Sequence, residues 1–315
     1  MKPLLVVNPR SSGGKTGAMF ARMREPIERA LGAVDVAETG GPRHAVDLAR
    51  EAALAGRETV IAVGGDGSIH EVVNGLMEAR DKGADKTKLG VIGAGTGGDF
   101  RKSLGLEHRL DRYCAAIADG KTRRVDVARV AYTTHEGAPA SAFFVNILSV
   151  GLGGLVDQYV ARGSRLLGGT AAYFLASTRA LIASEIGVVA CSFWLDGALR
   201  EEQIRTRNVA ICNGRFFGSG MEVAPMARLD DGVLEVVDLG AAPRLKFALD
   251  SSRIYSGEHM KSPDVRHFRC DRLKLVLENR QINERFLLDV DGEPLGTLPI
   301  EVTVDKGAIE VFAPA

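Results

Sequence analysis

A short glycine-rich segment between a strand and a helix constrains this chain more than any other feature. The residues Gly64-Gly65-Asp66-Gly67-Ser68 follow the β-rich run Glu58 to Val63 and precede a helical period that begins at Ile69. Glycines at such a junction let the backbone approach a ligand closely, and the first turn of a helix aims free amide groups at an anion. The segment therefore predicts a phosphate-binding loop. The alternative is a tight turn in which Asp66 or Ser68 caps the helix.

Strand and helix patterns alternate around this loop through the first 125 residues. A strand is expected from Leu4 to Asn8, and apolar residues at helical spacing follow between Met19 and Leu31 and again between Ala45 and Ala53. The helix after the loop extends to Met77, and another strand is expected from Leu89 to Gly93. This alternation is typical of a mostly parallel sheet that is covered by helices on both faces.

From about Val125 the pattern changes to short strands with turn signals, which predicts an antiparallel sandwich or barrel. The expected strands are Val125 to Val130, Phe143 to Val150, Cys191 to Leu195, Asn208 to Asn213, Val233 to Leu239, Leu273 to Glu278 and Phe286 to Val290. Only Thr170 to Ala183 and Arg244 to Ser252 have helical spacing between them. A last hairpin is expected to turn at 305–307. We therefore expect domains at 1–125 and 126–304, with the segment 305–315 able to return to the first.

The composition excludes several classes of protein. Forty Lys and Arg residues balance forty Asp and Glu residues, so no overall field would draw the chain to nucleic acid. No apolar run approaches the roughly 18 residues that a membrane-spanning helix needs. The four cysteines lie far apart with no CxxC pair, which indicates buried thiols in a reducing compartment. We expect a cytoplasmic protein with no transmembrane segment and no nucleic-acid partner.

Two other glycine patterns come close to known nucleotide motifs. Gly14-Lys15-Thr16 resembles the end of a Walker loop, but Pro9 stands where the first glycine should be. The segment Gly93 to Gly98 matches the GxGxxG pattern of dinucleotide-binding enzymes, although it follows several strand and helix units instead of opening the first. A dehydrogenase is therefore a weaker alternative at this point.

Five segments, in the same order, resemble the diacylglycerol kinase catalytic domain family, which includes bacterial lipid kinases and sphingosine kinases and shares its architecture with NAD kinases. The segments are Asn8 to Gly14, Gly64 to Leu76, Gly95 to Phe100, Asn213 to Gly232 and Asp291 to Pro294. Two positions differ, since Ser68 stands where the family has threonine and Gly98 where it has asparagine. The resemblance implies an amino-terminal α/β nucleotide domain, a carboxy-terminal antiparallel β-sandwich, and an active site in the cleft between them.

The resemblance also implies roles for individual residues. Nucleotide binding is implied for Asn8, Thr39, Gly64, Gly65, Asp66, Gly67, Ser68, Ile69, His70 and Thr96. Glu293 is implied as the group that accepts the proton of the substrate hydroxyl, with Asp66 completing an acidic cluster near the γ-phosphate. Asp291 lies two residues before Glu293, so extended geometry would point both side chains to the same side and let one orient the other. Composition alone favours a surface turn at Asp291-Gly292.

Asp231, in the turn Asp230-Asp231-Gly232, resembles a Mg²⁺ ligand of the family, with the backbone carbonyls of Arg228 and Val233 as companions. Oxygen ligands suit this hard cation. The alternative is a simple hairpin turn, and both can hold at once.

These features lead to one function and two alternatives. We expect an ATP- and Mg²⁺-dependent kinase that phosphorylates a hydroxyl of diacylglycerol or a related lipid, which it meets as a peripheral protein at the membrane surface. A homodimer is compatible with the sequence. One alternative is a kinase of a soluble alcohol, including an activity like that of NAD kinase. The other is a nucleotide-binding regulatory protein without catalysis, against which the retained Asp66, Asp231 and Glu293 argue.

Overall fold

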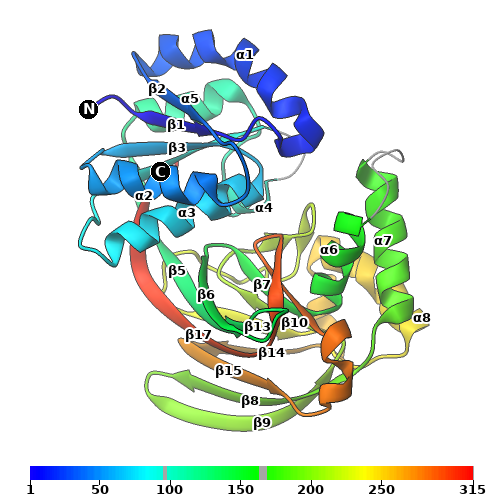
Figure 1. Cartoon of the computed structure of the whole chain (residues 1–315). Helices are drawn as coiled ribbons and strands as arrows, with labels where there is room; N and C mark the ends of the chain where they lie inside the picture. The colour runs from blue at the N-terminus through cyan, green and yellow to red at the C-terminus, as the bar shows by residue number, and fades with distance from the viewer. Residues whose placement is uncertain (95–97, 163–168, 315) are drawn as a thin grey trace.

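The computed structural model describes residues 1–94, 98–162 and 169–314, which form two lobes (Figure 1). The first lobe is a parallel sheet between helices. Its strands are β1 (Leu4–Val7), β2 (Asp35–Glu38), β3 (Thr59–Gly64) and β4 (Lys88–Gly93), in the spatial order β4-β3-β1-β2. Its helices are α1 (Ser11–Leu31), α2 (His44–Leu54), α3 (Asp66–Arg80), α4 (Asp99–Ser103) and α5 (Leu110–Ala118).

The central strands of this sheet are buried on both sides. Helices α1 and α5 lie over one face and α2 and α3 over the other (Figure 1), and Val60 to Val63 have no exposed surface. This double burial is the reason that β3 is a continuous apolar run without alternation. The predicted parallel sheet is confirmed, whereas the sequence analysis missed β2, α4 and α5.

The second lobe is an antiparallel β-sandwich, as predicted. Its strands are β5 (Thr122–Thr133), β6 (Pro139–Phe144), β7 (Ile147–Gly151), β8 (Gly187–Leu195), β9 (Ala198–Thr206), β10 (Asn208–Cys212), β13 (Leu234–Asp238), β14 (Arg266–Cys270), β15 (Arg272–Leu277), β16 (Leu287–Val290) and β17 (Glu293–Phe312). One layer has the order β14-β13-β10-β7-β16-β17 and the other the order β6-β5-β17-β15-β8-β9. A separate short hairpin pairs β11 (Phe216–Phe217) with β12 (Met221–Glu222). The two layers share β17.

The expected hairpin at 305–307 is wrong, because β17 continues as one strand through this segment. Gly307 has φ 58° and the register against β5 shifts between Asp305 and Ile309. The turn signal therefore marks a β-bulge, in which extra residues bend a strand without ending its pairing. Beyond the bulge, Glu310 and Val311 pair in parallel with β4. The strand begins in the sandwich and ends in the first lobe, where Figure 1 places the carboxy terminus.

Helices gather at one edge of the sandwich. They are α6 (Leu152–Arg162), α7 (Gly169–Ala183), α8 (Arg244–Ser251) and the 3₁₀ turn η2 (Ser252–Ser256), with η3 (Glu258–Lys261) beside them and η4 (Arg280–Arg285) before β16. The sequence predicted α7 and α8 but missed α6, because glycines at 153 and 154 lower helix propensity. Packing requires the second one, since a Cβ on Gly154 would lie 2.6 Å from the carbonyl of Leu287.

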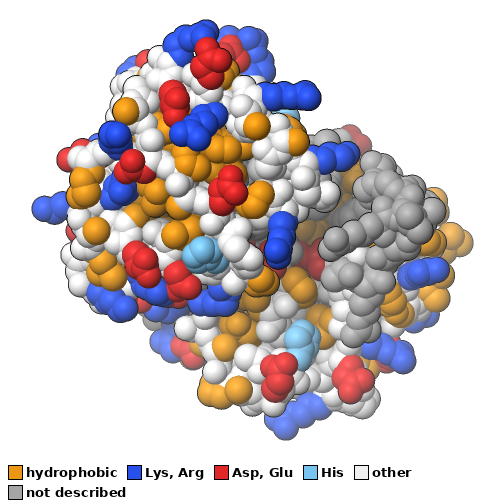
Figure 2. Space-filling model, turned by 45° about the horizontal axis from the view of Figure 1, so that its top comes forward, with side chains coloured by type: hydrophobic (Ala, Val, Ile, Leu, Met, Phe, Trp, Pro, Cys, Tyr) orange, Lys and Arg blue, Asp and Glu red, His pale blue; other side chains and the backbone are white. Residues whose placement is uncertain are grey.

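Two predictions that bear on the environment of the chain can be compared with this fold. Within the described residues, no helix is both long enough and apolar enough to cross a bilayer. The four cysteines are buried and free, as expected. Basic and acidic side chains are interspersed over the face in Figure 2, which agrees with the balanced composition.

Candidate active site

The glycine loop joins β3 to α3, and no side chain caps the helix. Gly65 is the N-cap residue, and α3 has no side-chain capping hydrogen bond, so the alternative of a turn capped by Asp66 or Ser68 is wrong. The hydroxyl of Ser68 is buried and has no partner within the described residues. A Cβ on Gly65 would meet no atom within 4 Å. The loop thus leaves open space beside its backbone and an unused buried hydroxyl, which suits a bound anion.

The residues expected to bind nucleotide follow the ends of parallel strands. Asn8 follows β1 and its Oδ1 accepts the backbone N–H of Arg10 at 3.1 Å. Thr39 follows β2, is buried, and its N–H donates to the carbonyl of Val7 at 2.8 Å. Since parallel strands end at one edge of a sheet, Asn8, Thr39 and the loop after β3 lie along the same edge. Thr96 lies outside the described residues.

Two more residues of the nucleotide group are buried in α3. Ile69 belongs to the hydrophobic core of the first lobe. The ring of His70 is turned toward the second lobe, where its Nδ1 lies 3.5 Å from Oδ2 of Asp291. The side chains of both residues are therefore buried, and Nδ1 of His70 makes no hydrogen bond within the described residues.

Asp66 holds the start of another helix. Its carboxylate accepts the backbone N–H groups of Gly98, Asp99 and Phe100 at 2.9, 3.1 and 3.3 Å. These amides form the amino-terminal end of α4, where a negative charge is favourable. Burial, followed by the nearby charge of Asp99, raises the pKa of Asp66 in spite of these bonds. The side chain that the sequence assigned to the acidic cluster is therefore also a structural link from the glycine loop to α4.

Glu293, the first residue of β17, reaches the glycine loop from the second lobe. Its Oε1 lies 2.8 Å from the position that a Cβ on Gly67 would occupy. Within the described residues its carboxylate accepts no hydrogen bond, and burial raises its pKa. A carboxylate with a raised pKa and free lone pairs, beside a phosphate-binding loop, can accept a proton from a hydroxyl group.

Asp291 sits in a turn between β16 and β17, as composition suggested, but the turn is buried. With φ 53° the residue is left-handed, so the extended geometry expected for Asp291 and Glu293 is wrong. Its carboxylate accepts the N–H groups of Val145, Asn146 and Ile147 at 2.9 to 3.1 Å. These bonds also explain why the strand expected from Phe143 to Val150 is broken into β6 and β7. Asp291 fixes the turn that carries Glu293.

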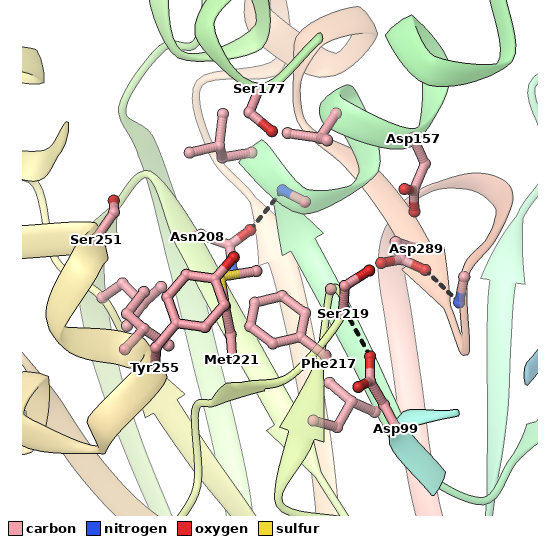
Figure 3. Close-up of a pocket in the computed structure, with 18 of the residues that line it drawn as sticks. Asp99, Asp157, Ser177, Asn208, Phe217, Ser219, Met221, Ser251, Tyr255 and Asp289 are labelled. Carbon is pink, nitrogen blue, oxygen red and sulfur yellow. Dashed lines mark hydrogen bonds between the residues drawn. The ribbon is translucent and has the colours of Figure 1, made fainter. Parts of the chain in front are cut away.

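Two further carboxylates, Asp157 of α6 and Asp289 of β16, were missed by the sequence analysis. They face each other in the close-up of Figure 3. Burial raises the pKa of Asp157 to about 6, and burial together with the charge of Asp157 raises that of Asp289 well above its usual range. The pair therefore binds a proton more tightly than ordinary aspartates do. Asp289 could have been found from the sequence, because Asp289, Asp291 and Glu293 place an acidic residue at every second position. No pattern in the neighbouring sequence distinguishes Asp157.

A cavity of about 570 Å³ extends from these carboxylates toward the helices at the edge of the sandwich. One end is acidic, with Asp66, Asp99, Asp157, Asp289 and Asp291 in its lining. The other end is apolar, with Leu152, Val156, Leu181, Phe217, Met221, Phe247, Ile254 and Tyr255. Figure 3 shows the aromatic rings of Phe217 and Tyr255 across from the aspartates. The first lobe contributes Asp66 and Asp99, so the cavity lies between the lobes.

A loop of the second lobe closes the acidic end. Asp99 accepts the backbone N–H of Ser219 at 2.9 Å (Figure 3) and the ammonium group of Lys102 at 3.1 Å. Ser103 of α4 donates to Oδ1 of Asn146 at 3.4 Å. Helix α4 is thus bound to the loop after β11 and to the segment that Asp291 holds.

Asp231 does not join this group in the described structure. Its carboxylate accepts the N–H of Val233 at 3.1 Å and a guanidinium N–H of Arg269 at 2.9 Å, and it is not in the lining of the cavity. A guanidinium group in this position competes with a divalent cation for the same oxygens. Within the described residues, no group of three or more His, Cys, Asp or Glu side chains is arranged to hold a metal. The fit of Mg²⁺ at Asp231 is therefore poor unless Arg269 moves away.

Comparison with known proteins identifies relatives along almost the whole chain. A model of the diacylglycerol kinase catalytic domain matches residues 2–130, and a model of the YegS C-terminal NAD kinase beta sandwich-like domain matches residues 146–313. A protein of Chromohalobacter salexigens named probable lipid kinase YegS-like is 31% identical over 98% of this chain and 92% of its own length. The diacylglycerol kinase of Bacillus subtilis is 28% identical over 94% of this chain and 91% of its own.

Among solved structures, a diacylglycerol kinase from Bacillus anthracis has a TM-score of 0.69 against this chain. The match covers 99% of this chain and 97% of that one, with 20% identity. At this identity the likeness concerns the fold, and it extends over both lobes.

Proposed function

The chain belongs to the diacylglycerol kinase catalytic domain family, and at that level it is a lipid kinase, an enzyme that phosphorylates an alcohol group. On this premise we propose that it transfers the γ-phosphate of ATP, bound with Mg²⁺, to a hydroxyl of diacylglycerol or a related lipid. We further propose that the enzyme is cytoplasmic and meets this lipid at the membrane surface.

One observation carries the choice of a lipid acceptor, namely the polarity of the cavity. Its acidic end lies beside the glycine loop, and the remainder is walled mostly by apolar side chains. A soluble polyhydroxy acceptor would need hydrogen-bonding groups along its whole length, whereas an acyl chain needs only apolar walls. Phe143 and Phe144 of β6 are core residues and do not line the cavity. The apolar walls come from α6, α7, α8, η2 and the β11–β12 hairpin.

We propose Glu293 as the proton acceptor. It lies against Gly67, its carboxylate is free of hydrogen bonds within the described residues, and its raised pKa brings it nearer to the working range of a general base. Asp291 would act through Glu293 by fixing the turn before it. Asp66 would keep α4 and the loop in register while contributing negative charge near the site of transfer.

The proposed nucleotide site uses the edge of the parallel sheet. Asn8, Thr39 and the loop from Gly64 to Ser68 would hold the nucleotide, and we keep Thr96 in the same role. Bound Mg²⁺ supplies neutralisation of the phosphate charge during transfer. The Mg²⁺ ligand role of Asp231, with the carbonyls of Arg228 and Val233, stays a separate proposal, and no step of the transfer depends on it.

The test is transfer of labelled phosphate from ATP to a panel of extracted lipids and soluble alcohols, with the product identified by mass. We expect a phosphorylated lipid that forms with Mg²⁺ and does not form after chelation. Label on a soluble alcohol alone would favour the activity like that of NAD kinase. Tight ATP binding without transfer to any acceptor would favour a regulatory protein.

A further inference from the structure

Exposed apolar side chains gather on the helices that enclose the apolar end of the cavity. Leu245 and Leu249 of α8 are 76% and 68% exposed, and Ile182 of α7 is 67% exposed. Tyr255 of η2 and Leu175 of α7 are also exposed. We call these five residues the α7–α8 rim. Single exposed apolar residues are ordinary on a protein surface, but a cluster on neighbouring helices marks an interaction site.

The two helices of the rim are joined. Arg244, the first residue of α8, donates to the carbonyl of Ser184 at 2.7 Å and to that of Leu181 at 3.2 Å. Ile182 follows Leu181 and Leu245 follows Arg244 in the chain, so these hydrogen bonds join α7 and α8 next to their exposed side chains. Figure 1 shows the lower end of α7 beside α8 at the edge of the sandwich.

The rim is continuous with the mouth of the cavity. Leu245, Ala248, Leu249 and Ser252 follow at positions i, i+3, i+4 and i+7, which form one face of α8 and its continuation. Ala248 and Ser252 line the cavity, while the two leucines stay outside it. Tyr255 does both, because it lines the cavity and remains more than half exposed. An apolar ligand could therefore pass from the rim into the cavity along this face of α8.

Three ion pairs lie around the rim. Lys246 pairs with Asp264, Arg253 with Asp250 and Lys261 with Glu258. Figure 2 shows hydrophobic and basic side chains next to each other at the right-hand edge of the molecule, where Figure 1 places α8. Three cations near the rim are thus paired with acids, whereas Arg244 donates only to backbone carbonyls. The exposed leucines therefore offer this surface its main means of contact, and they suit an apolar partner.

We propose that the α7–α8 rim inserts into the surface of a lipid bilayer, so that the mouth of the cavity opens into the acyl region. This inference rests on the proposed function, since only a lipid acceptor must leave a bilayer to reach the carboxylates. An apolar helix face inserts roughly 5–10 Å into the headgroup boundary, enough to cover the rim. A second copy of the chain seated here would instead close the mouth, which favours the bilayer as the occupant.

The test is vesicle binding of the full chain with two pairs of leucines exchanged for serine. One variant is Leu245→Ser with Leu249→Ser. The matched control is Leu54→Ser with Leu199→Ser, two exposed leucines of α2 and β9 far from the rim. The probes are phosphatidylcholine vesicles that contain diacylglycerol, the same vesicles with added phosphatidylglycerol as anionic lipid, each at low and high salt, and a short-chain diacylglycerol dissolved as monomers. Sedimentation gives the oligomeric state of each protein.

We expect the rim variant to bind vesicles at least about tenfold more weakly, because two leucines lose their burial in lipid. Its turnover of the dissolved short-chain lipid should stay within about twofold of the wild type, and the control should match the wild type in both assays. Binding of the wild type to the neutral vesicles should persist at high salt, because apolar insertion does not depend on attraction between charges.

Three results would overturn the rim proposal. They are unchanged vesicle binding of the rim variant, binding that needs anionic lipid and disappears in salt, and conversion of a dimer to a monomer with vesicle binding intact. A failure of the proposed function gives a different result. The wild type would then phosphorylate no lipid, dissolved or in vesicles, although its binding to vesicles would still depend on Leu245 and Leu249.

Discussion

Replacing Asp157 with asparagine should stabilise the protein at neutral pH and weaken the pH dependence of its stability. Asp157 and Asp289 face each other as partly buried residues in the lining of the cavity, and desolvation raises the pKa of Asp157 to about 6. An acid that binds its proton more tightly in the folded state stabilises the fold only while it is protonated. Asparagine has the same shape as the aspartic acid and removes the charge that appears at higher pH.

The sign and size of the effect follow from the two pKa values. An unfolded aspartate titrates near 3.9, so between about pH 4 and pH 6 the folded protein binds more protons than the unfolded one. The free energy of unfolding therefore falls as pH rises through this window. The linkage relation gives the size of this decrease. For one aspartate with these two pKa values, the free energy of unfolding falls by about 1.5 kcal/mol between pH 5 and pH 8.

The measurement is urea unfolding of the wild type and of Asp157→Asn at pH 5 and pH 8. We expect the wild type to lose about 1 to 1.5 kcal/mol more than the variant between these pH values. Asp119→Asn is the matched control, because Asp119 is exposed at the end of α5 and its replacement should leave the pH dependence as in the wild type. Equal pH dependence in the wild type and in Asp157→Asn would refute the reasoning.

Four other changes probe the site. Glu293→Gln should lower kcat by a factor of about 10² or more without lowering the melting temperature, since the amide cannot accept the proton; wild-type turnover in the labelled phosphate assay would contradict this. Asp66→Asn should also remove most activity while the protein stays folded, with a loss of about 1 kcal/mol in urea unfolding because three amides lose a charged acceptor. Gly67→Ala should lower kcat more than it raises KM for ATP, because the new methyl group would displace Oε1 of Glu293; the opposite split would place Glu293 away from the reaction. Arg269→Ala should strengthen Mg²⁺ binding in calorimetry if Asp231 is a ligand, and no change would argue against that role.

The strands and helices that the sequence predicted correctly are those that the spacing of nearby apolar residues indicates. The apolar run before Gly64 identified a strand buried on both faces, and the helical spacing after Ile69 identified α3, so the loop between them followed from short-range pattern alone. The antiparallel sandwich was predicted in the same way, from short strands separated by turn signals. In each of these cases the residues that determine the structure are neighbours in the chain.

The features that the sequence missed depend on contacts between distant segments. The signal at Asp305-Lys306-Gly307 is the same for a hairpin and for a bulge, and pairing of β17 with β5 across the bulge decides the outcome. Asp291 takes a left-handed conformation because three amides from 145–147 surround its carboxylate. Asp157 faces Asp289 only because Gly154 lets α6 approach β16 closely. No local pattern contains these partners.

The hydrogen bonds of Asp66, Asp291 and Glu293, the three carboxylates that the sequence assigned to catalysis, separate their roles. Asp66 and Asp291 each accept three backbone amides, and so their lone pairs are committed to α4 and to the break between β6 and β7. Glu293 accepts none within the described residues and lies against Gly67. A proton acceptor needs a free lone pair, whereas an anchor needs many bonds. This contrast supports the assignment of proton transfer to Glu293 and of positioning to the two aspartates.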